Sequence, residues 1–224
     1  MNTPKVHYED NHLIIVEKPP GLLVQADDTK DGTLTDWAAA YIQKKYKKPG
    51  RAFCHPCHRL DRPVGGLVIF ARTSKGLERM NELFRNQEVE KSYLAIVDGT
   101  PLEPMKTLVH FLEKDTKKNK AHTRKKGGGN AKRAELSYSL IATHSHISLL
   151  LVKPKTGRPH QIRIQLRENE TPIKGDTKYG YPKMNKDKNI SLHAYKLSFI
   201  HPVKKEPVTV ISRPDWPEFE AFYR

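Results

Sequence analysis

A sharp turn followed directly by an apolar run is the feature that most constrains how this chain folds. Pro63, Gly65 and Gly66 exclude a helix there, and residues 67–71 are all apolar. A short apolar run bounded by turn residues is typical of a buried strand. We therefore predict a buried strand at residues 67–71 that is entered through a rigid turn.

Asp61 lies in this turn, between Arg59 and Arg62. Nearby positive charge favours the anionic form of a carboxyl group, so we expect Asp61 to be ionised. A turn that feeds a buried strand holds a side chain rigidly at the edge of the core, which suits a catalytic group. The alternative is an Asp that only caps its turn, beside arginines on a solvated face.

The composition points to a polyanionic partner. The 224 residues include 40 Lys or Arg against 25 Asp or Glu, giving a formal net charge of +15 at pH 7. Such an excess fits nucleic acid or an anionic membrane surface. No apolar run approaches the ~20 residues of a membrane span, and the N-terminus lacks the apolar segment of a signal peptide. With only two cysteines, we expect a cytoplasmic protein that binds nucleic acid and no membrane.

Apolar periodicity and turn residues predict the remaining elements. Residues 13–17 form an apolar run that Lys18-Pro19-Pro20-Gly21 stops abruptly, which indicates a strand. A helix is expected at residues 34–46, where Thr33 and Asp36 form a capping pair. The clearest helical pattern covers residues 74–87. Further strands are expected at residues 91–99, 106–113, 134–143, 146–152 and 208–211, and short helices after Pro159 and at residues 217–222.

Residues 114–133 differ in composition from the rest of the chain. They hold nine Lys or Arg against one acidic residue, Asp115, which gives 9 − 1 = +8 of the net charge. We expect a mobile loop that contacts phosphate, with a solvated hairpin tip as the alternative.

Residues 54–58, with the sequence CHPCH, invite a metal interpretation. A closed zinc site needs four ligands, and the chain contains no second cysteine pair. A His-x-Glu at His7 and Glu9 also occurs in zinc deaminases, but Phe53 replaces the proline that precedes the first cysteine there. We therefore expect no metal, and Cys54 and Cys57 to be small buried residues.

Several segments, in order along the chain, resemble the RluA-type pseudouridine synthases. Residues 58–61 (HRLD) resemble the catalytic motif of that family. The other segments that resemble the family are residues 17–21 (EKPPG), 91–93 (KSY), 156–163 (TGRPHQIR) and 172–180 (PIKGDTKYG), followed by a closing strand from residue 192 to Pro202.

The resemblance implies an α+β fold in which helices and loops surround a long, bent, mostly antiparallel sheet with a central cleft. It implies a single catalytic domain over residues 1–224, without the S4 RNA-binding domain of many relatives. The implied reaction converts specific uridines of rRNA or tRNA to pseudouridine without a cofactor. We expect the enzyme to act as a monomer.

The resemblance also implies roles for individual residues. Asp61 is expected to attack C1′ or to stabilise a cationic sugar. Tyr93 is expected to stack on the base, and Arg163 to pair with Asp61. Arg59 is expected to enter the gap that the flipped nucleotide leaves. Further RNA contacts are expected from Arg62, Arg158, His160, Lys125 and Lys126.

Residues 62–66 (RPVGG) depart from the family pattern, which has Thr and Ser before the final Gly. We expect altered support of the turn rather than lost activity. Two other functions stay open: an inactive RNA-binding protein with the synthase fold, and a zinc deaminase.

Overall fold

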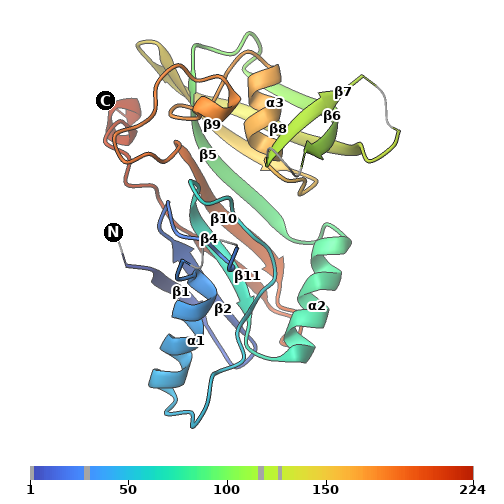
Figure 1. Cartoon of the computed structure of the whole chain (residues 1–224), viewed down its shortest axis with the longest axis vertical. Coiled ribbons are helices and arrows are strands. Elements are labelled where there is room, and N and C mark those ends of the chain that lie inside the picture. The colour runs from blue at the N-terminus through green and yellow to red at the C-terminus, as the bar shows by residue number, and fades with distance from the viewer. Residues whose placement is uncertain (1–2, 28–30, 116–118, 126–127, 224) are drawn as a thin grey trace. The chain divides into compact units, whose positions relative to one another are not determined.

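The computed structural model describes residues 3–27, 31–115, 119–125 and 128–223 (Figure 1). Its contacts divide the chain into two compact units. Unit 1 comprises residues 1–91 and 194–213, and unit 2 comprises residues 92–193 and 214–224. Both units combine helices with antiparallel strand pairs, which confirms the predicted α+β class. The single domain inferred from the sequence stays a prediction.

Unit 1 contains a sheet in the order β1-β2-β4-β10. Strand β2 pairs antiparallel with β4 from Leu13↔Ala71 to Lys18↔Gly66. Every residue of β4 is buried, as the apolar run predicted. The strands and their bounds are β1 (Lys5–Glu9), β2 (Leu13–Lys18), β3 (His55–Pro56), β4 (Gly65–Ala71), β10 (Leu192–Ile200) and β11 (Pro207–Ile211); β3 pairs with β4, and β11 with β10.

Two helices of unit 1 begin at the residues that sequence capping rules indicate. Helix α1 (Leu34–Lys45) begins after Thr33, whose side chain accepts a hydrogen bond from the Asp36 backbone N–H. Helix α2 (Ser74–Arg85) is capped in the same way by Thr73, which accepts from Gly76. Each cap satisfies a backbone donor that would otherwise lack a partner. The apolar side of α2 packs on the core of β2 and β4 through Leu77, Met80, Leu83 and Phe84.

Unit 2 contains a second set of strands in the order β5-β9-β8-β6-β7. Strands β5 and β10 each have residues in both units. The strand bounds are β5 (Glu90–Asp98), β6 (Met105–Asp115), β7 (Lys120–Arg124), β8 (Lys132–His144) and β9 (Ile147–Pro154), and the helices are α3 (Gln161–Glu168) and the 3-10 helices η1 (Thr177–Tyr179) and η2 (Phe219–Tyr223).

The strand register of unit 2 places Tyr93 and helix α3 on the same face of the sheet. Tyr93 of β5 lies opposite Val152, which lies opposite Tyr138 of β8. Ala134 shares the face of Tyr138, because residues four apart on a strand point the same way. Ala134 packs in one apolar cluster with Ile164 of α3. The sheet thus brings two proposed catalytic elements to one side.

The prediction of a loop over residues 114–133 was wrong in part. Strand β7 pairs with β6 from Phe111↔Arg124 to Asp115↔Lys120, and β8 begins at Lys132. Ala121 of β7 packs into the apolar cluster of α3, and this burial favours a strand despite the charged composition. Residues 116–118 and 126–127, including Lys126, lie outside the described residues.

No helix within the described ranges is long and apolar enough to cross a membrane.

We predict that Gly66→Ala destabilises unit 1. Gly66 has a φ of 110°, and a Cβ there would lie 2.4 Å from the carbonyl oxygen of Ala194. The substitution should lower the free energy of unfolding by more than about 1 kcal/mol, because both backbone conformation and close packing resist a side chain. Denaturant unfolding checks this, with Gly32→Ala as the matched control, since its added Cβ would meet no atom within 4 Å. Equal changes in the two variants would contradict the packing argument.

Candidate active site

The turn that carries Asp61 is anchored to the core on both sides. The backbone N–H of Val64 donates to the carbonyl oxygen of Asp61 at 3.0 Å and closes the turn. Leu60 and Val64 are buried, whereas Arg59 is exposed and Asp61 is half-buried. The buried neighbours therefore hold the Asp61 carboxylate at the edge of the core, as predicted.

A buried lysine, Lys18, joins this turn to the Lys-Pro-Pro-Gly turn. Its ammonium group donates to the carbonyl oxygens of Pro19 at 3.1 Å, Leu22 at 2.8 Å and Arg62 at 3.1 Å. Burial lowers the pKa of Lys18 to about 7, while the negative charge of Asp61 opposes that shift. The three carbonyl oxygens also favour the charged form. Lys18 thus lies buried against the turn, and its protonated form attracts the carboxylate of Asp61.

Backbone contacts between Gly21 and Arg62 reinforce the same junction. The Gly21 N–H donates to the Arg62 carbonyl oxygen at 2.8 Å, and the Arg62 Nε–H donates to the Gly21 carbonyl oxygen at 3.1 Å. The Arg62 guanidinium also pairs with Asp31 at 2.9 Å. These contacts hold a turn that lacks the Thr and Ser of the family pattern.

His58 anchors the start of the motif. Its Nε2 accepts a hydrogen bond from the Ile69 backbone N–H at 3.1 Å, and its ring lies 5.1 Å from that of Phe84. Burial lowers the pKa of His58 to about 3, with a smaller contribution from Lys91. The neutral imidazole therefore has a structural role.

In unit 2, Arg163 forms a buried ion pair with Asp176. The Arg163 Nε lies 2.7 Å from Asp176 Oδ2, and its Nη2 lies 2.8 Å from Oδ1. Both residues are almost fully buried, at 5% and 1% exposure. The sequence alone predicts no role for Asp176 in the site. The expected pairing of Arg163 with Asp61 stays a prediction.

Tyr179 also contacts Arg163. The guanidinium carbon lies 5.0 Å from the centre of the Tyr179 ring. The Tyr179 hydroxyl accepts from the Ala121 backbone N–H at 2.8 Å and lies 2.8 Å from His160 Nδ1. His160 has a φ of 53°, an unusual conformation for a residue with a side chain. The expected RNA contact His160 is thus part of the support of Arg163.

The other predicted RNA contacts differ in their surroundings. Arg59 and Lys125 are exposed. Arg158 is half-buried, and its Nε–H donates to the Arg133 carbonyl oxygen at 3.1 Å. Exposed cations such as Arg59 and Lys125 can reach phosphate, whereas Arg158 also ties the α3 turn to β8.

The residues behind the metal interpretation have other roles. Cys54 is buried, and burial raises the pKa of both Cys54 and Cys57 to about 12, so both thiols stay protonated. His7 Nε2 lies 2.6 Å from Glu17, and Glu9 accepts hydrogen bonds from Lys45 and Tyr46. Over the described ranges, His, Cys, Asp and Glu form no group of three that could hold a metal ion.

Sequence reasoning missed two site residues, Lys18 and Asp176. A lysine in a turn is ordinarily exposed, and only the directly preceding apolar run hinted that Lys18 is buried. Asp176 pairs with a residue 13 positions away, which no local pattern indicates.

Known proteins resemble this chain in both structure and sequence. The solved structure of Human RNA Pseudouridylate Synthase Domain Containing 1 is 25% identical and has a TM-score of 0.74, covering 96% of this chain and 85% of that one. The fold is therefore that of the pseudouridylate synthases. The tRNA pseudouridine synthase C of Haemophilus ducreyi is 33% identical in an alignment of length 219 that covers 91% of this chain and 88% of that protein. Ribosomal large subunit pseudouridine synthase D of Borreliella burgdorferi is 31% identical over 85% of this chain and 59% of its own length.

The family model described as RNA pseudouridylate synthase matches residues 12–168. The chain belongs to this family, and it is an isomerase that converts uridine in RNA to pseudouridine.

We predict that Lys18→Met destabilises the turn that carries Asp61. The apolar side chain removes the Nζ donor from the carbonyl oxygens of Pro19, Leu22 and Arg62. The Arg62 oxygen keeps the Gly21 N–H and the Pro19 oxygen keeps the Leu22 N–H at 3.5 Å, so the Leu22 oxygen loses most. A buried acceptor left unpaired costs about 1–3 kcal/mol, and the free energy of unfolding should fall by about that amount. The measurement is denaturant unfolding beside Lys5→Met, which removes an exposed lysine of β1. A loss no larger than in Lys5→Met would show that water replaces the lost donor.

Proposed function

We propose that the chain is a cytoplasmic, cofactor-free pseudouridine synthase that modifies a uridine of tRNA. Five relatives named tRNA pseudouridine synthase C match along 88–95% of their own length. Ribosomal RNA is the second candidate substrate. It is supported by relatives named large subunit synthases, which match along 59–66% of their length.

Asp61 is the proposed catalytic carboxylate. The observation that carries this assignment is its rigid turn, closed by Val64 and held from beneath by Lys18. During the reaction the N1–C1′ bond breaks, the base turns, and a C5–C1′ bond forms. The proton on C5 leaves and N1 gains a proton, so electrons balance without a redox partner. Asp61 either attacks C1′ or stabilises positive charge on the sugar.

Arg163 is proposed to pair with Asp61 and to keep it ionised. A guanidinium has five N–H donors, and Asp176 takes two of them along one edge. The remaining donors suit a second carboxylate, because arginine can bind two planar partners on different edges.

Tyr93 is proposed to stack on the target base. Strand β5 holds this half-buried ring on the sheet face that α3 covers. A phenol ring offers a flat surface to a uracil whatever its sequence context. Arg59, exposed beside the catalytic turn, is proposed to enter the space that the flipped nucleotide leaves.

We predict that Asp61→Asn abolishes pseudouridine formation but keeps RNA binding and the fold. Asn has the shape of Asp without its charge, and it can neither attack C1′ nor offset a cationic sugar. Release of tritium from RNA labelled at uridine C5 measures turnover, because the C5 proton leaves during the reaction. The assay uses tRNA and rRNA transcripts in parallel, which also identifies the substrate class. If Asp61→Asn released tritium faster than RNA without enzyme does, Asp61 would not be the nucleophile.

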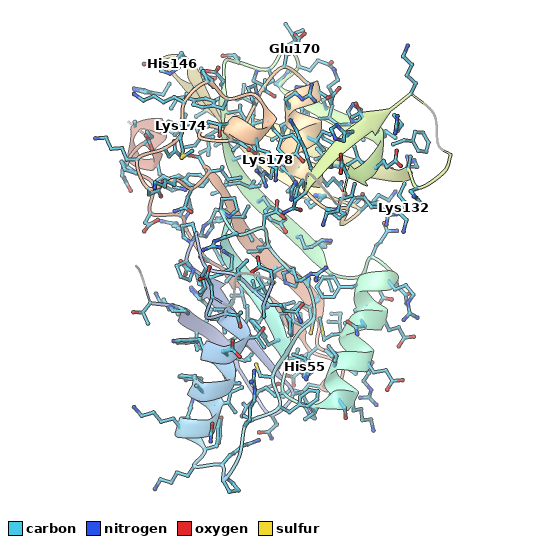
Figure 2. The ribbon with its side chains drawn as sticks, viewed as in Figure 1. His55, Lys132, His146, Glu170, Lys174 and Lys178 are labelled. Carbon is cyan, nitrogen blue, oxygen red and sulfur yellow. The ribbon has the colours of Figure 1, made fainter. Side chains whose placement is uncertain are left out.

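The exposed lysines of residues 114–133, the basic segment, are proposed to contact RNA phosphates. Arg124 pairs with Glu113 at 2.7 Å, and Arg133 pairs with Glu135, so the structure partly neutralises these arginines. Lys125 and Lys132 are exposed and form no ion pair with a described residue; Lys132 is labelled in Figure 2. These two lysines are therefore free to neutralise phosphate.

We predict that the double variant Lys125→Gln/Lys132→Gln weakens RNA binding and flattens its salt dependence. Each lost phosphate contact should reduce the slope of log affinity against log salt by about 0.7–0.9. The double variant should thus lose roughly 1.5 units of slope. Substitutions are preferable to deletion, because β7 also supplies the Ala121 N–H that supports Tyr179. Binding at several salt concentrations checks this, with the exposed pair Lys5→Gln/Lys75→Gln as control. If the double variant and the unmodified protein had identical slopes, Lys125 and Lys132 would not contact phosphate.

A further inference from the structure

We propose that Asp176 is a positioning residue of the isomerase, which aims the guanidinium of Arg163. The inference rests on the proposed function, in which Arg163 acts on Asp61. Asp176 itself is assigned no contact with RNA.

The ion pair fixes the guanidinium along one edge. Two parallel contacts, at 2.7 Å and 2.8 Å, join Nε and Nη2 of Arg163 to the two oxygens of Asp176. A bidentate pair sets both the direction and the rotation of the planar group, which a single contact cannot do. Because both residues are buried, neither can exchange its partner for bulk water.

The backbone around Asp176 is itself closed. The Asp176 N–H donates to Ile173 at 3.0 Å, and its carbonyl oxygen accepts from Tyr179 at 3.0 Å and Tyr181 at 3.1 Å. Gly175, with a φ of 85°, supplies the left-handed residue that the turn requires. The backbone that carries the Asp176 carboxylate is therefore fixed, and the carboxylate holds Arg163 in one position.

Tyr179 fixes the guanidinium from a second direction. Its ring lies against the guanidinium, at 5.0 Å from the carbon, and its hydroxyl is held by the Ala121 N–H and by His160. Asp176 directly precedes the 3-10 helix η1, and Tyr179 is the last residue of that helix. One short segment thus holds both an edge and a face of Arg163.

This arrangement determines where the other donors of Arg163 point. Two of the five N–H groups face Asp176, so the remaining three are directed along the other edges. In the proposed function these donors orient the catalytic carboxylate. Asp176 would then act on the rate only through Arg163, and not through substrate affinity.

The test is a double-mutant cycle between Asp176→Asn and Arg163→Met. The rate of pseudouridine formation is measured in single turnover at saturating enzyme, and RNA affinity and unfolding midpoint are measured separately. Asp176→Asn should slow the reaction on the order of 10- to 100-fold, because a small misplacement of a catalytic group is costly. In the Arg163→Met background the same substitution should change the rate by less than about two-fold, since its target is gone. RNA affinity should stay unchanged in both variants.

The matched control is Glu170→Gln, which neutralises an exposed carboxylate of unit 2 that is labelled in Figure 2. A normal rate in Asp176→Asn, or an equal loss in both backgrounds, would overturn the inference. If Asp176→Asn does not fold, Arg163→Lys answers the same question, because lysine keeps the positive charge but cannot form the two parallel contacts of the guanidinium with Asp176. A normal rate in Arg163→Lys would likewise overturn the inference. A normal rate in Arg163→Met alone would overturn the proposed function of Arg163, and this inference with it.

Discussion

Each unit contains a buried basic side chain that has to be hydrogen-bonded by the surrounding protein: Lys18 in unit 1 and Arg163 in unit 2. Removing Lys18 or Arg163 from water is unfavourable unless the protein supplies compensating partners. Unit 1 supplies three carbonyl oxygens from two turns, and unit 2 supplies the carboxylate of Asp176. Because those partners must converge on the cation, satisfying it also fixes the segments that carry them. The catalytic turn and the arginine helix are thus ordered by the same physical requirement.

Much of the fold could be predicted from the sequence because its signals are local. The apolar run at residues 67–71 became the buried strand β4, and Thr33 caps α1 as its pairing with Asp36 indicated. The helical pattern at residues 74–87 became α2, which ends two residues earlier. In each case the determining contacts lie within a few positions, where hydrophobic period and capping chemistry are readable.

The features that could not be predicted depend on distant contacts. Strand β7 lies in a segment whose charge suggested a loop, and its order follows from Ala121, which contacts Tyr179, 58 residues away. The resemblance assigned Arg163 to Asp61 and gave no indication of Asp176 as a partner. An Asp in an exposed turn and an Asp in a buried ion pair cannot be told apart from the local sequence, because the fold determines which side chains are removed from water.

The proposed catalytic residues are divided between the units: Asp61 belongs to unit 1, and Tyr93 and Arg163 belong to unit 2. Two of them are supported by neighbours from their own unit, Asp61 by Lys18 and Arg163 by Asp176 and Tyr179. An isomerisation without a cofactor has to obtain its rate from groups that are correctly placed before the substrate arrives. Supporting each group within its own unit achieves this, because the local geometry of each does not rely on RNA. It also accounts for the burial of Lys18 and Asp176, because their interactions hold the turn of Asp61 and the guanidinium of Arg163 in place.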